Sequence, residues 1–215
     1  MFFPYKDDNP RILVPYVTYG IIGLNVLVFL FQVGLGQQSN HKLILLFGLI
    51  PAHWSLISLF TSMFLHGGFA HLLGNMWFMW IFGDNVESAL GHVRYLIFYF
   101  LCGIGAAVAQ TAINLDSMIP MIGASGAISG VLAAYMLQYP KARVHVFMFL
   151  FIFFTTFRVP AFVVIGFWFL EQLTNGLGSI GLDISGGVAW FAHIGGFIAG
   201  AGLIKLNPLI RIEKI

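Results

Sequence analysis

The chain has 215 residues, of which 59% are hydrophobic and 8% charged, and its mean hydropathy is +0.91. Soluble domains carry about 25% charged residues, so the composition excludes a soluble protein and indicates an integral membrane protein. The formal charge of +2 is too small to indicate nucleic-acid binding. One cysteine, Cys102, excludes an intramolecular disulfide and a cysteine-based metal cluster.

Hydrophobic runs separated by charges, prolines and glycines predict six membrane-spanning helices in one domain, residues 1–215. The fold class expected is therefore an all-α membrane bundle. If both termini are cytoplasmic, nine of the ten basic residues lie inside and only Lys42 lies outside, which fits the positive-inside rule. The predicted spans are 15–34, 67–84, 93–113, 120–138, 159–177 and 187–205.

Two apolar segments do not fit this pattern of spans. Residues 144–157 would rise only about 21 Å as a helix, which is short of a hydrocarbon core about 30 Å thick. Crossing there would also place Arg158 outside and His193 in the opposite leaflet from Ser125. We therefore expect an interfacial or re-entrant segment. The first outer loop, 34–66, is too apolar for an ordinary loop and is expected to lie in the membrane interface.

A serine stands in the sequence Gly123-Ala124-Ser125-Gly126, near the outer end of the fourth predicted span. Free backbone N–H groups and the helix dipole favour negative charge at a helix N-terminus, so an oxyanion would be stabilised there. The alternative is that these small residues only allow close helix packing. Taken alone, the tetrapeptide favours the second interpretation.

A histidine in the last predicted span changes this balance. His193 could take the proton of a serine hydroxyl and pass it to a leaving amine, although it could also bond a neighbouring helix or belong to a proton path. Gly196 and Gly200 follow it at small-xxx-small spacing, which allows close approach of another helix. No Asp or Glu lies deep in a span to orient the imidazole, so a Ser-His dyad is more plausible than a triad.

The second predicted span contributes His71 and Asn75, which are four residues apart and share one helix face. They could donate hydrogen bonds to an oxyanion, each worth about 3 kcal/mol in well-studied acyl-transfer enzymes, or form a structural network between helices. His66 precedes them at the start of the helix, where structural support is at least as plausible as catalysis. No metal-binding motif is present, and no cofactor is expected.

Rise per residue places three of these polar groups at one height. Ser125, His193 and His71 each stand about 18–20 Å above the cytoplasmic end of their helix, or roughly 10 Å below the outer surface of the bilayer. The agreement predicts a single site in the outer half of the membrane. A transporter or proton channel would more often place its polar groups along a path across the whole bilayer.

Together these motifs resemble the rhomboid intramembrane serine proteases of the minimal six-helix bacterial type. By that resemblance Ser125 is the nucleophile and His193 the general base. The oxyanion hole would comprise His71, Asn75 and the Ser125 N–H. The motifs that carry the resemblance are His66, His71-x-x-x-Asn75, Gly83-x-x-x-Glu87-x-x-x-Gly91 with Tyr99, Gly123-x-Ser125-Gly126 and Ala192-His193-x-x-Gly196-x-x-x-Gly200, with Glu87 in a structural role.

One position departs from the pattern of the family, in which some members carry an aromatic residue one turn after the nucleophile that packs on the catalytic histidine. Here that residue is Ser129, so either another group, such as the aromatic Trp190 or Phe191, holds the imidazole or the imidazole is held less firmly.

The resemblance implies a multi-pass protein of a cell inner (plasma) membrane that cleaves transmembrane segments of other proteins near the outer leaflet. Its partners would be such substrates and the lipid bilayer; the sequence indicates no oligomeric state. Substrates would arrive from the lipid between the second and fifth helices, and the glycine-rich segment 175–187 would form a mobile cap. An inactive relative that only binds membrane helices would be expected to lack the serine or the histidine.

Overall fold

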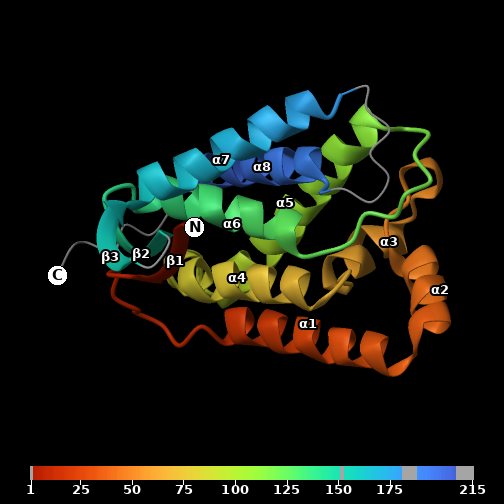
Figure 1. Ribbon diagram of the computed structural model, residues 1–215, viewed down its shortest axis with the longest axis horizontal. Helices are drawn as coiled ribbons and strands as arrows, with labels where there is room; N and C mark the ends of the chain where they lie inside the picture. The colour runs from red at the N-terminus through yellow and green to blue at the C-terminus, as the bar shows by residue number, and fades with distance from the viewer. Residues whose placement is uncertain (1, 151–152, 181–187, 207–215) are drawn as a thin grey trace.

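Helices make up most of the protein and lie side by side as a bundle, with a three-stranded antiparallel sheet at one end (Figure 1). The computed structural model describes residues 2–150, 153–180 and 188–206. The elements are β1 (Phe2–Asp7), α1 (Tyr16–Gly34), α2 (Gln37–Phe47), η1 (Pro51–His53), α3 (Leu56–Thr61), η2 (Ser62–Phe64), α4 (Phe69–Leu90), α5 (His92–Ile113), α6 (Ser125–Gln138), β2 (Arg143–Leu150), β3 (Phe153–Pro160), α7 (Ala161–Gly178) and α8 (Trp190–Leu206).

The helical part of the expected fold is confirmed, whereas the expectation of an all-α bundle is wrong, because β1, β2 and β3 form a sheet. Among the described residues, α1 and α5 are long and apolar enough to cross a membrane, and they match the predicted spans 15–34 and 93–113 closely. A third candidate arises if the bent pair formed by Leu56–Phe64 and α4 counts as one span. The crossing of all six predicted helices stays a prediction.

Two of the predicted helices have different ends in the structure. α4 continues to Leu90 instead of ending at 84, because Asp84 and Glu87 inside it have polar partners on neighbouring elements. α6 begins at Ser125, five residues later than predicted. The residues before it are held by a bridge between Met121 and Leu49 of the first loop, so the helix starts at the serine itself.

The apolar segment 144–157 forms strands, which the sequence interpretation did not predict. β2 and β3 pair as an antiparallel hairpin, and β1 from the N-terminus adds a third strand beside β2. Alternate side chains of β2 face the bundle, since Val144 and Val146 are fully buried. This alternation is the period of a strand, and it allows a short apolar segment to pack on one face without crossing the bilayer.

The first loop, 34–66, is largely helical, with α2, α3 and two short 3-10 turns. Its last part, Leu56–Phe64, meets α4 at an angle of 91°. Whether this segment lies in the membrane interface stays a prediction.

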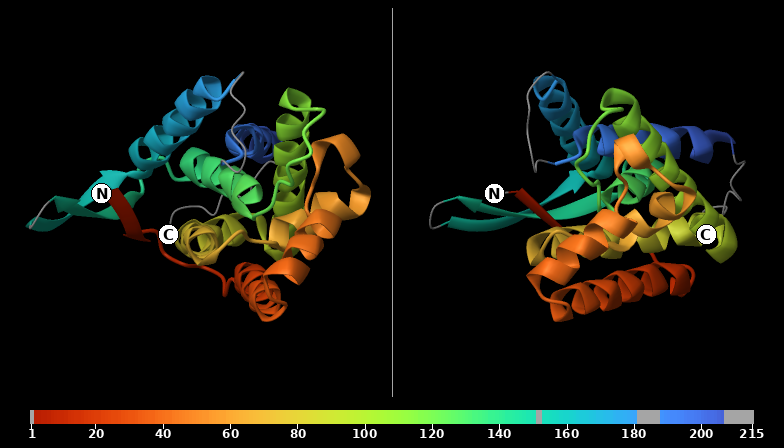
Figure 2. Two further views of the ribbon diagram at one scale, coloured as in Figure 1. Left: turned by 45° about the vertical axis from the view of Figure 1, so that its right-hand side comes forward. Right: turned by 90° about the vertical axis from the view of Figure 1, so that its right-hand side faces the viewer.

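The core of the bundle is α6, which packs against α4, α5, α7 and α8 (Figure 2). Its closest neighbour is α8, where Gly196 faces Gly126 and Gly200 faces Gly130. A Cβ atom at Gly196 would lie 1.9 Å from the carbonyl oxygen of Gly126, so only glycine permits this approach. The two helices run parallel, which places the first turn of α6 beside the first turn of α8.

Candidate active site

Ser125 and His193 meet where α6 and α8 begin. The Oγ atom of Ser125 lies 2.8 Å from Nε2 of His193, within hydrogen-bond distance. Both residues are only partly buried. A hydroxyl in this position can donate its proton to an unprotonated imidazole nitrogen, which is the geometry that serine activation requires.

Ser125 is the first residue of α6, so the N–H groups of this first turn lack partners within the helix. The positive end of the helix dipole adds to their preference for negative charge. Ser129 stands one turn after Ser125, where an aromatic residue could have packed on the imidazole, and it is fully buried. Its hydroxyl donates to the carbonyl oxygen of Ser125 at 2.7 Å and therefore does not support the imidazole.

His71 and Asn75 of α4 lie against Gly123, two residues before Ser125. A Cβ atom at Gly123 would lie 2.6 Å from Nε2 of His71 and 3.5 Å from Nδ2 of Asn75. Gly123 also has φ +118°, a conformation that other residues rarely adopt. Glycine therefore meets two needs here: the backbone conformation and the close approach of two polar side chains to the segment that leads into Ser125.

His66 connects α4 to the first loop. Its Nε2 atom lies 2.9 Å from Nδ2 of Asn75, and its Nδ1 atom lies 3.3 Å from the carbonyl oxygen of Phe64. Gln32 of α1 bonds both the backbone N–H and the carbonyl oxygen of His66. His66 is fully buried, and its contact with Nδ2 holds the amide of Asn75 in position.

The imidazole of His193 has contacts on α7 as well as with Ser125. Its Nδ1 atom lies 2.7 Å from Oε1 of Gln172, a buried residue that the sequence interpretation did not single out. The ring of Trp168 lies 5.9 Å from the imidazole, and Trp190 meets it edge-on at 6.3 Å. Trp190 was one of two expected aromatic groups, whereas Phe191 lies near Gly176 of α7 instead.

Glu87 lies at the opposite end of α4 from His71. Its carboxylate is fully buried and accepts hydrogen bonds from the backbone N–H groups of Val17 and Thr18 and from the Thr18 hydroxyl, at 2.7–2.9 Å. Nδ1 of His92 lies 2.6 Å away. The carboxylate thus accepts hydrogen bonds from free N–H groups at the start of α1. It does not contact Ser125.

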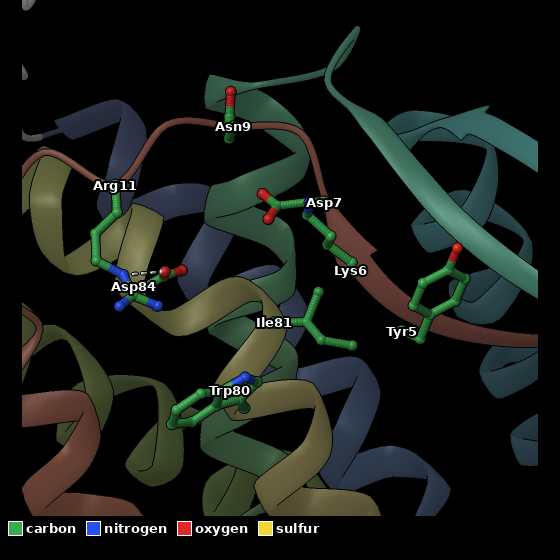
Figure 3. A pocket seen from close by; sticks show the side chains of 8 residues that line it. All are labelled: Tyr5, Lys6, Asp7, Asn9, Arg11, Trp80, Ile81 and Asp84. Carbon is green, nitrogen blue, oxygen red and sulfur yellow. Dashed lines mark hydrogen bonds and ion pairs between the residues drawn. The ribbon is translucent and has the colours of Figure 1, made fainter.

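A second polar cluster lies beside Glu87, where β1 meets α4. Figure 3 shows the ion pair between Arg11 and Asp84, with Asp7 nearby on β1. Asp7 accepts a hydrogen bond from the hydroxyl of Tyr135 at 2.5 Å. Burial, with the negative charge of Asp84 adding to it, raises the pKa of Asp7 to about 6 despite that bond.

The predicted mobile cap, 175–187, is only partly described. Residues 175–178 belong to the last turn of α7, and 181–187 lie outside the described residues.

The family model of the Rhomboid domain matches residues 53–207, and the chain therefore belongs to this family. Rhomboid protein 1, mitochondrial, of Saccharomyces cerevisiae is 29% identical over 204 residues, which cover 92% of this chain and 54% of that protein. RHOMBOID-like protein 6, mitochondrial, of Arabidopsis thaliana is 30% identical over 150 residues, 68% of this chain and 41% of that protein. Rhomboid protease AarA of Providencia stuartii is 28% identical over 222 residues, 93% of this chain and 74% of that protein.

This match confirms the family resemblance drawn from the motifs. Rhomboids are known as intramembrane proteases, and some members are inactive. The chain spans about half the length of the yeast relative and less than half of the Arabidopsis one. The expected location in a cell inner (plasma) membrane is contradicted, because the yeast and Arabidopsis relatives are mitochondrial by name.

Proposed function

We propose that the protein is an intramembrane serine endopeptidase in which Ser125 and His193 form the catalytic dyad. The observation that carries the proposal is the 2.8 Å contact between Ser125 Oγ and His193 Nε2 at the first turn of α6. Supporting it are the free N–H groups of that turn and the two polar side chains of α4 that lie against Gly123. The relative AarA is a protease by name.

In this proposal His193 Nε2 takes the hydroxyl proton while Ser125 Oγ attacks the carbonyl carbon of the substrate peptide bond. The resulting oxyanion is stabilised by His71, Asn75 and the Ser125 N–H. His193 then passes the proton to the amide nitrogen, the C–N bond breaks, and an acyl-enzyme ester remains. Water attacks the ester with His193 again as the base, which releases the carboxyl product and restores the serine.

The substrates are transmembrane segments of other membrane proteins. We propose that α1 and α4–α8 all cross the bilayer. With 14 residues, α6 rises about 21 Å, so its first residue would stand about 10 Å below the surface of a core about 30 Å thick. α4 and α7 each pack on α6 but share almost no packing in the described part of the chain. A substrate helix would therefore reach Ser125 between them.

Cleavage of a model transmembrane substrate by purified protein in vesicles tests this function. Ser125→Ala and His193→Ala should each lower kcat at least about a thousandfold, since removing either member of a dyad removes the activated nucleophile. Ser129→Ala, a buried serine one turn further along α6, is the matched control and should keep activity within about tenfold. Unchanged cleavage by folded Ser125→Ala would refute the proposal.

A further inference from the structure

Gln172 is a buried amide in the middle of the apolar helix α7, with 3% of its surface exposed. A buried amide is costly unless both of its polar atoms have partners. Here Nε2 donates to the carbonyl oxygen of Trp168 at 3.1 Å, and Oε1 lies 2.7 Å from Nδ1 of His193.

These two contacts determine which way the amide faces. The carbonyl oxygen of Trp168 can only accept a hydrogen bond, so it requires the NH₂ group of Gln172. The opposite orientation would place two oxygen acceptors 3.1 Å apart. The oxygen of Gln172 is therefore the atom that meets His193, and it can only accept.

This orientation in turn determines the tautomer of His193. An acceptor at Nδ1 requires the proton on that nitrogen, and a neutral imidazole carries only one N–H proton. Nε2 is therefore left with its lone pair facing the hydroxyl of Ser125 at 2.8 Å. That is the state in which an imidazole can act as a general base.

We propose that Gln172 is a positioning residue of the active site, which holds His193 in the tautomer that activates Ser125. This inference rests on the proposed protease function. The amide takes the place that a carboxylate holds in a Ser-His-Asp triad, and it orients the ring without adding a charge. Trp168, one turn earlier on α7, and Trp190 contact the same imidazole and restrict its rotation.

One consequence is that three helices supply the linked residues Ser125, His193 and Gln172. Ser125 stands on α6, His193 on α8 and Gln172 on α7. A displacement of α7 away from α8 would break the hydrogen bond at Nδ1, so the reactivity of Ser125 depends on the position of α7.

The test compares two substitutions of Gln172 in the purified full chain with the model substrate. Gln172→Met keeps the length of the side chain and removes the acceptor, so kcat should fall about 10- to 100-fold with KM changed less than threefold. Gln172→Glu, with its buried carboxyl group protonated toward the Trp168 carbonyl, keeps an acceptor at Oε1 and should recover at least tenfold of the loss. Gln110→Met is the control, because Gln110 accepts from the backbone of Ala192 and does not touch the imidazole; it should stay within threefold.

The tautomer itself is read by ¹⁵N NMR of histidine-labelled protein in micelles, with the His193 signal assigned by its loss in His193→Ala. The parent chain should show Nδ1 protonated and Nε2 free, and Gln172→Met should show a mixture. A kcat for Gln172→Met within twofold of the parent, an equal loss in Gln172→Glu, or an unchanged tautomer would each overturn the proposal. Ser125→Ala is measured in parallel: if it still cleaves, the protease function has failed, not only the role of Gln172.

Discussion

The polar side chains at the two ends of α4 differ in how fully their hydrogen-bonding capacity is filled. Near its start, His71 and Asn75 face Gly123, and His71 keeps few bonds of its own. Near its end, Glu87 is enclosed by donors from α1 and α5. In this bundle a buried polar group whose bonding capacity is filled is structural, and we propose that one with a donor still facing the site takes part in the chemistry.

The largest expected effect is a loss of stability when Glu87 is substituted. Glu87→Ala leaves two N–H groups of α1 and the Thr18 hydroxyl without their acceptor, which should lower the free energy of unfolding by about 3 kcal/mol. Unfolding in mixed micelles measures this. Glu171→Ala, an exposed acid on α7, is the control, and an equal effect of the two substitutions would contradict the assignment.

The second effect is on activity, at the Asn75 end. Asn75→Ala removes one donor to the oxyanion and should lower kcat about 100-fold, while the free energy of unfolding falls by only about 1 kcal/mol through the lost bond to His66. The matched control is Asn25→Ala, a buried asparagine that bonds within α1 and should leave kcat unchanged. Loss of stability without loss of kcat would make Asn75 a structural residue like Glu87.

The smallest effect is on the pH dependence of stability, and it arises from Asp7 at the end of the bundle that carries the sheet. Because the pKa of Asp7 is about 6 in the folded protein and near 3.8 in the unfolded chain, the folded state holds the proton more tightly. The contribution of protonated Asp7 to the free energy of unfolding is complete below about pH 4 and is lost as the pH rises through 6. We expect the loss to be about 1–2 kcal/mol, after allowing for solvent screening of a partly exposed group.

Asp7→Asn tests this, because it removes the titrating group and keeps the shape. The difference in unfolding free energy between pH 4 and pH 7.5 should be smaller in the variant than in the parent chain. An identical difference in both would show that Asp7 does not contribute to the pH dependence.

Much of the fold follows from local pattern, because apolar runs long enough to span a bilayer as a helix predict helices. The sheet does not, since β2 pairs with residues 2–7, more than a hundred residues away, and no local signal predicts that pairing. The late start of α6 likewise depends on a bridge to Leu49 in the first loop.

The residues of the candidate site also divide into those that a local pattern predicts and those that it does not. The sequence places Ser125, His193 and His71 at one height, because rise per residue is a local property. Gln172 does not stand out in the sequence, because Glu171 precedes it and Thr174 and Asn175 follow shortly after. Its partner, His193, is 21 residues away on another helix, so only the packing of α7 on α8 shows what the amide contacts.

The most direct measurement of the central claim is covalent labelling by a fluorophosphonate, which reacts with an activated serine and needs no substrate. The account predicts a single adduct, mapped by mass spectrometry to Ser125, and at least a thousandfold slower labelling in His193→Ala. Labelling at the same rate without His193, or an adduct at another serine, would contradict it.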